Sequence, residues 1–284
     1  MKKNLWILMS VVLTMLVFTA CEKDDSSSDT KAVFSYITDG FKVNFTNFST
    51  NATDYSWDFG DQSEPSILSN PVHVFPQKGQ YLVTLTAKMG TATSTFTDTV
   101  LIIGPNIKID GDFTDWAYVD YTHENAPGTG GSLTGIKTFA SAGYLNFYVE
   151  GTSDFSFTVL DFYLDADNNP ATGYSAWMYP AGSGADYLFE GSVPGEWGDV
   201  YQHVGPGNDW NWNAIASFSD VLQFSAFKTV SGKQAVEFAI KRSALSAMQG
   251  YVNFAILESN SGWAEIGAMP ADQTPESKFI AFKL

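Results

Sequence analysis

Cysteine, histidine and arginine are scarce in this sequence of 284 residues. A single cysteine, Cys21, excludes a disulfide within the chain and a cysteine-based zinc site. The three histidines, His73, His123 and His203, stand far apart, so a histidine-rich zinc site is not expected. Arg242 is the only arginine, and 15 Lys and Arg against 31 Asp and Glu give a formal net charge of −16. Nucleic acid is therefore not an expected partner, because neutralising a phosphate backbone needs clustered Lys and Arg.

Residues 1–20 have the pattern of a signal peptide. Lys2 and Lys3 precede an apolar stretch over 5–18, which is shorter than the roughly 20 residues of a membrane-spanning helix. Small residues then stand directly before Cys21. The segment resembles a bacterial lipoprotein signal, and this resemblance implies that Cys21 is lipidated and becomes the mature N-terminus. The alternative is an ordinary secreted protein with an unpaired cysteine.

Residues 21–31 are predicted to be a flexible tether, because EKDDSSSD follows Cys21 without any apolar residue. A lysine followed by two acids at this place is similar to the export signal of surface lipoproteins in glycan-foraging gut bacteria. That resemblance implies a lipid anchor in the outer membrane and a protein that faces outward on the cell surface.

Residues 32–104 read as short strands separated by turns, which predicts a small antiparallel sandwich. The motifs YSWDFGD at 55–61, PVHVF at 71–75 and KGQYLVTL at 78–85 resemble those of polycystic-kidney-disease (PKD) domains in order and spacing. Gln62 departs from the family, which usually has glycine there. The resemblance implies an immunoglobulin-like sandwich that acts as a spacer or as a weak interaction module. Trp57 is expected at the centre of its core, since large aromatics supply most of the burial in a small domain.

Residues 105–284 show regularly spaced strand patterns with Gly-rich turns, which favours a jelly-roll-like β-sandwich and makes the whole chain all-β. The opening motif IDGDFTDW at 109–116 resembles that of family 9 carbohydrate-binding modules and their DOMON-like relatives. The segments 162–174 and 184–188 support this resemblance. Trp116 is expected to be a core anchor rather than a ligand platform.

An acidic loop in this second module is a candidate calcium site. Oxygen ligands recur at every second position in Asp165, Asp167 and Asn169, and calcium takes six to eight oxygens. Thr172 offers a hydroxyl, and Asp186 is a candidate ligand from another strand. The expected role is structural. The alternative is an ordinary turn, because Asp and Asn are common turn residues.

Aromatic residues make up 15% of the chain, and several tryptophans of the second module stand in polar, Gly-rich loops. The predicted ligand-binding residues are Trp177, Tyr179, Trp197, Trp210 and Trp212. Flat aromatic faces stack on the apolar face of a sugar, while neighbouring polar groups bind its hydroxyls. The alternative is that these side chains fold back as lids on the sandwich.

The leading functional hypothesis is a non-catalytic, lipid-anchored glycan-binding protein of the cell surface. Its expected partners are a glycan or oligosaccharide, the outer membrane through the lipid, and other glycan-uptake proteins. One alternative is a glycoside hydrolase, for which Asp161, Glu190, Glu196 and Asp199 supply carboxylates that no motif pairs. A structural or adhesin-like surface protein is the other alternative.

Overall fold

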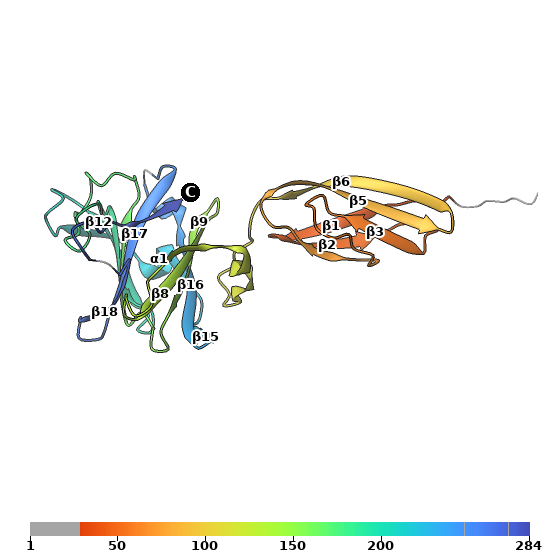
Figure 1. Cartoon of the computed structure of the whole chain (residues 1–284). Coiled ribbons are helices and arrows are strands. Elements are labelled where there is room, and N and C mark those ends of the chain that lie inside the picture. The colour runs from red at the N-terminus through yellow and green to blue at the C-terminus, as the bar shows by residue number, and fades with distance from the viewer. Residues whose placement is uncertain (1–28, 247, 272) are drawn as a thin grey trace, which may run out of the picture.

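The computed structural model describes residues 29–246, 248–271 and 273–284. The predicted signal peptide, Cys21 and most of the predicted tether lie outside the described residues. The described chain forms two β-sandwich modules that follow one another along the sequence (Figure 1). The predicted all-β fold, with a small first sandwich and a larger second one, is confirmed. Within the described part, no helix is long and apolar enough to cross a membrane.

The first module packs two three-stranded antiparallel sheets face to face. One sheet has the order β1 (Phe34–Asp39), β2 (Lys42–Asn47), β4 (Val72–Val74), and the other β3 (Asp54–Asp58), β5 (Gly79–Met89), β6 (Ala92–Ile102). Trp57 lies fully buried between them, with its ring centroid 5.1 Å from that of Phe34 and 5.3 Å from that of Phe45. Its indole Nε1 donates a 2.9 Å hydrogen bond to the Leu68 carbonyl oxygen. The predicted central position of Trp57 in the core is thus confirmed.

The second module is built from a seven-stranded and a six-stranded antiparallel sheet. The larger sheet runs in the order β13 (Trp212–Ser217), β12 (Trp197–His203), β11 (Tyr187–Ser192), β10 (Val159–Asp165), β17 (Tyr251–Ser259), β18 (Glu265–Met269), and β19 (Ile280–Lys283) also pairs with β17. The smaller sheet runs in the order β14 (Leu222–Phe224), β16 (Lys233–Lys241), β9 (Tyr144–Gly151), β8 (Leu133–Ala140), β7 (Tyr121–Glu124), and β15 (Lys228–Val230) pairs with β16. Three short helices, η1 (Phe113–Tyr118), α1 (Phe218–Val221) and η2 (Arg242–Ala244), complete the module.

The main core of the second module lies between its two sheets and is rich in phenylalanine. Phe147 and Phe238 of the smaller sheet stack with ring centroids 4.7 Å apart, and Phe162 and Phe254 of the larger sheet stack at 5.5 Å. Successive residues of a strand point to opposite sides. Phe162 therefore faces this core, while its neighbours Asp161 and Tyr163 point to the outer side of the larger sheet.

The outer side of the larger sheet carries a second buried layer. The long connection between β10 and β11, residues 166–186, folds back over the sheet and buries Tyr174, Met178 and Tyr179 against Tyr163 and Leu188. This cover protects β10, β11 and β17. Strand β12, nearer the sheet edge, keeps Trp197 and Asp199 exposed on the same side. The cover therefore leaves one part of the outer face open.

The opening motif of the second module is held by one buried acid, Glu237 of β16. Its carboxylate accepts hydrogen bonds from the backbone N–H groups of Asp110 (2.8 Å) and Gly111 (2.5 Å) and from Trp116 Nε1 (2.9 Å). Gly111 has φ +80°, a conformation that side chains rarely adopt. Trp116 is 1% exposed, which confirms its predicted role as a core anchor.

Replacing Glu237 by Ala should lower the free energy of unfolding by about 2–4 kcal/mol, because it removes the acceptor of three donors, two of them buried with it. Urea denaturation of the full chain measures this change. Glu276→Ala, at an exposed position, is the matched control and should shift the free energy by less than about 0.5 kcal/mol. Equal losses in the two variants would show that Glu237 does not hold the motif.

Candidate functional site on the outer face of the larger sheet

The open part of the outer face is organised by the register of three strands. Asp161 of β10 pairs with Glu190 of β11, and Glu190 pairs with Asp199 of β12. Directly opposed residues of an antiparallel pair lie on the same side of the sheet. The three carboxyl groups therefore form one row across the sheet. Trp197 stands two residues before Asp199 on β12, where it pairs with Ser192 of β11, so it lies on the same side of the sheet as the row.

Two exposed tryptophans meet next to this acidic row. Trp197 begins β12, and Trp263 lies in the turn between β17 and β18. Their ring centroids are 6.5 Å apart with an interplanar angle of 47°, and the residues are 48% and 57% exposed. Large apolar side chains gathered on an open surface are typical of binding sites. Trp197 was predicted from the sequence, and Trp263 was not.

Asp161 and Glu190 stand directly opposite each other on β10 and β11. Burial, together with the facing Glu190 carboxylate, raises the pKa of Asp161 to about 7. Burial also raises the pKa of Glu190. Asp161 Oδ1 is buried and has no hydrogen-bond partner among the described residues. A protonated Asp donates a hydrogen bond and a carboxylate accepts one, so a carboxyl pair on neighbouring strands can supply both functions.

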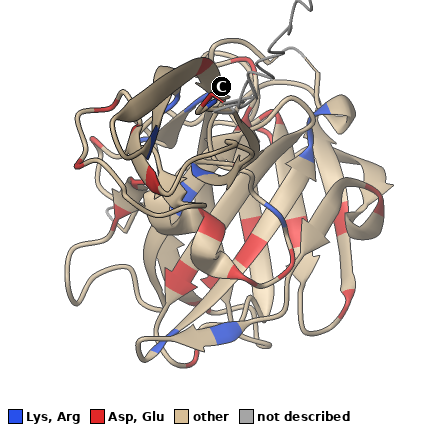
Figure 2. Cartoon of the chain, turned by 90° about the vertical axis from the view of Figure 1, so that its right-hand side faces the viewer, with Lys and Arg blue, Asp and Glu red and all other residues tan. Residues whose placement is uncertain are grey.

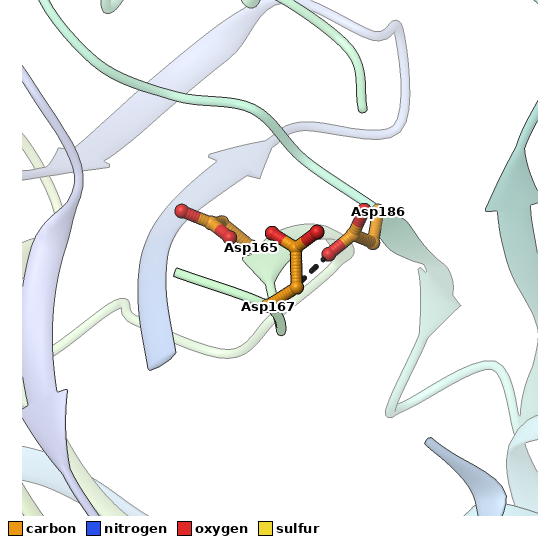
Figure 3. A group of neighbouring side chains, drawn as sticks. All are labelled: Asp165, Asp167 and Asp186. Carbon is orange, nitrogen blue, oxygen red and sulfur yellow. Dashed lines mark hydrogen bonds between the residues drawn. The ribbon is translucent and has the colours of Figure 1, made fainter. Parts of the chain in front are cut away.

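The fold brings three of the predicted metal-binding residues close together. Asp165, Asp167 and Asp186 each place one carboxylate oxygen within 4.8 Å of the others (Figure 3). Asp186 accepts hydrogen bonds from the backbone N–H groups of Ala166 (2.9 Å) and Asp167 (3.2 Å). Burial raises the pKa of Asp165 to about 6 and also raises that of Asp186. This acidic triad has the oxygen chemistry of a site for a hard cation.

Asn169 and Thr172 support the carboxylates of the triad. The Asn169 backbone N–H donates to Asp165 Oδ1 (3.1 Å) and to Asp167 Oδ1 (2.9 Å), and its own side-chain oxygen accepts from the Ala171 N–H (3.2 Å). Thr172 Oγ1 donates to Asp167 Oδ2 at 3.0 Å. Both residues therefore shape the loop through hydrogen bonds to the acids.

The other residues predicted to bind a glycan lie in different parts of the second module. Trp177 is 75% exposed on the covering loop, and Trp210 is 58% exposed after β12. Trp212 is half-buried, and its ring centroid lies 5.6 Å from that of Tyr174. Tyr179 corrects the prediction, since it is fully buried and its hydroxyl donates to the Pro270 carbonyl oxygen at 2.8 Å. Tyr179 is a lid residue because its apolar ring fits against the outer face and its hydroxyl has a backbone partner.

Replacing Asp161 by Asn should change how stability depends on pH. The folded-state pKa of about 7 lies above the ordinary value of 3.8, so the favourable contribution of this group is complete below the ordinary value and is lost as pH rises through about 7. Through Asp161 alone, the free energy of unfolding should fall by a few kcal/mol, on the order of 4, across that interval.

Denaturation at a series of pH values measures this effect. EDTA in all samples chelates divalent cations, so that metal binding to the acidic triad does not add to the pH dependence. Asp161→Asn should not show the decline of the parent, whereas Asp199→Asn, at an exposed position of the same row, should follow the parent. A constant difference between the parent and Asp161→Asn at every pH would contradict the raised pKa of Asp161.

Comparison with known proteins identifies the first module. The family model of the PKD domain matches residues 18–102. The PKD1 domain of Vibrio anguillarum Epp is 33% identical, with a TM-score of 0.26, over 27% of this chain and 96% of that one. A family 9 carbohydrate-binding module from Caldicellulosiruptor kristjanssonii, solved with cellotriose, is 14% identical, with a TM-score of 0.34, over 57% of this chain and 77% of that one. No curated protein matches. The first module is therefore a PKD domain.

Proposed function

We propose that this protein binds a glycan, without chemical turnover, on the outer face of the larger sheet. The observation that carries the proposal is the meeting of Trp197 and Trp263, both exposed, beside the row of Asp161, Glu190 and Asp199. An indole face covers the C–H face of a pyranose ring, and adjacent carboxyl groups bind its hydroxyls. Trp177, 75% exposed on the covering loop, is a further residue of this proposal.

The charge of the molecule supports a neutral or cationic glycan rather than an acidic one. Acidic residues outnumber basic ones two to one in the chain. Figure 2 shows the acidic residues, in red, spread over many strands and loops. At the site itself, the residues beside the two indoles are carboxylic acids. A sulfated or uronic-acid polymer would meet like charge there.

A glycoside hydrolase was the alternative drawn from the sequence, and Asp161 and Glu190 were among its candidate acids. Glycosidases hold their two carboxyl groups on either side of the scissile bond, with space for the sugar between them. Asp161 and Glu190 instead face each other directly on neighbouring strands, and Asp161 Oδ1 is buried. This arrangement favours recognition of hydroxyl groups over bond cleavage.

Calcium is the proposed occupant of the acidic triad. Asp165, Asp167 and Asp186 stand at the two ends of the covering loop, so a cation shared by them ties the beginning of the loop to its end. Three neighbouring carboxylates repel one another, and the cation removes this repulsion. Its role is to fix the cover on the outer face.

The lipid anchor at Cys21 and the location on the outer membrane belong to the same proposal. They rest on the sequence pattern before and after Cys21. In this arrangement the PKD domain is the spacer between the lipid and the glycan-binding module.

Single substitutions Trp197→Ala and Trp263→Ala should each weaken glycan binding about tenfold or more, because one stacked sugar buries apolar surface worth about 1–3 kcal/mol. A glycan array with the full chain selects the glycan, and calorimetry measures the affinities. Tyr144→Ala is the control, since Tyr144 is 39% exposed on the smaller sheet.

Circular dichroism checks that each variant is folded. Folded variants that bind like the parent would contradict the aromatic site, and a parent that binds no glycan of the array would contradict the function itself. Release of shorter sugars during the incubation would instead favour the hydrolase.

Calcium should raise the melting temperature of the second module. A cation that binds only the folded state adds about 2.7 kcal/mol to the free energy of unfolding when its free concentration is a hundredfold above its Kd. Asp167→Ala should abolish this rise, and Asp154→Ala, in an exposed turn outside the triad, should retain it. Identical melting curves of the parent in EDTA and in millimolar calcium would rule out the site.

A further inference from the structure

A second aromatic cluster lies at the other end of β12 from the Trp197 and Trp263 pair. Trp210 packs edge-on against Tyr174, with ring centroids 5.1 Å apart, and against Trp212 at 5.6 Å. Trp212 in turn packs on His203 at 5.0 Å. Trp210 keeps 58% of its surface exposed on top of this support. Its indole is thus held in place by other rings while much of it remains accessible.

The backbone around this second cluster is also fixed. His203 Nε2 lies 2.9 Å from the Asp209 carbonyl oxygen, and the Val204 N–H donates to the Asn211 carbonyl oxygen at 2.9 Å. The Ser175 N–H donates to the Gly207 carbonyl oxygen, which joins this loop to the covering loop. An ordered loop loses little conformational freedom on binding, so an aromatic ring that it carries is a preorganised platform.

Each of the two aromatic clusters includes one end residue of β12, Trp197 in the first and His203 in the second. Val200 of β12 points into the core, and successive residues of a strand point to opposite sides. The outer side of β12 therefore carries Trp197, Asp199, Tyr201 and His203. Trp197 and His203 are the two ends of β12, six residue-to-residue steps apart, which corresponds to about 20 Å of extended strand. This length exceeds a single sugar ring severalfold.

The path between the two clusters is open and polar. Asp199 is exposed, and Tyr201 is partly exposed. On the neighbouring edge strand β13, the residues paired with them are small: Ser217 faces Asp199 and Ala214 faces Tyr201. Small residues on the edge strand leave the outer side of β12 uncovered, and the Asp199 carboxylate and the Tyr201 hydroxyl offer hydrogen bonds to sugar hydroxyls.

We infer that β12 is a binding track for an extended glycan chain, with Trp197 and Trp263 at one end and Trp210 at the other. This inference rests on the proposed glycan binding and specifies its substrate class: a linear oligosaccharide or polysaccharide, bound along several consecutive sugars, rather than a monosaccharide or a chain end. Two platforms joined by one ligand act together, so affinity rises when the ligand is long enough to reach both.

The test is the dependence of affinity on chain length, measured by calorimetry with the full chain. The probes are linear gluco-, xylo- and manno-oligosaccharides from the disaccharide to the hexasaccharide. In at least one series, the parent should bind the hexasaccharide about tenfold or more tightly than the disaccharide. Trp210→Ala should remove this gain and leave disaccharide binding unchanged, and Tyr144→Ala should keep both.

A second variant addresses the middle of the track. Ala214 is exposed on the edge strand, so Ala214→Trp adds bulk beside Tyr201 without entering the core. It should weaken binding of the hexasaccharide and spare the disaccharide. Equal affinity for all lengths, or equal losses for short and long probes in Trp210→Ala, would overturn the track while leaving glycan binding intact. Absence of binding in every series would contradict the proposed function, and the track with it.

Discussion

The strand register of β10, β11 and β12 is the constraint on which the rest of the second module depends. Phe162 and Phe189 face the core between the sheets, and this burial fixes Asp161 and Glu190 on the opposite side. A shift of the register by one residue exchanges the two sides of a strand. It would place carboxylates in a phenylalanine core, which carries a large desolvation cost. Core packing therefore determines the geometry of the candidate site.

The covering loop divides the outer face into a closed part and an open part. Its apolar side chains bury Tyr163 and Leu188, and its two ends converge at Asp165, Asp167 and Asp186. Carboxyl groups held this close favour either protonation or a bound cation, and burial, with a smaller contribution from Asp186 and Asp167, raises the pKa of Asp165.

Much of this architecture follows from sequence patterns of short range. The alternation in the strands predicts two sandwiches, and the two buried tryptophans, Trp57 and Trp116, stand in motifs that mark them. The spacing of Asp165 and Asp167 likewise predicts that they come together, and Asp186, the ligand predicted from another strand, lies beside them. Each of these features depends on neighbours within a few residues or on a known motif.

The features that the sequence did not reveal depend on long-range pairing. Trp263 meets Trp197 across several strands, and Asp161 meets Glu190 only through the β10 and β11 register. Tyr179 was predicted wrongly because it shares a polar, Gly-rich loop with Trp177, and composition does not distinguish the side chain that turns inward. A buried acid such as Glu237 gives no local signal, since its three donors lie more than a hundred residues away.

The proposed glycan contact at Trp197 and Trp263, on the outer face of the larger sheet, can be tested directly. The most direct measurement is heteronuclear NMR of the tryptophan indole N–H signals, assigned by single substitutions, during titration with a glycan that the protein binds. The signals of Trp197 and Trp263 should move, while those of the buried Trp57 and Trp116 should stay in place. Saturable binding that leaves the Trp197 and Trp263 signals unchanged would contradict the proposed contact.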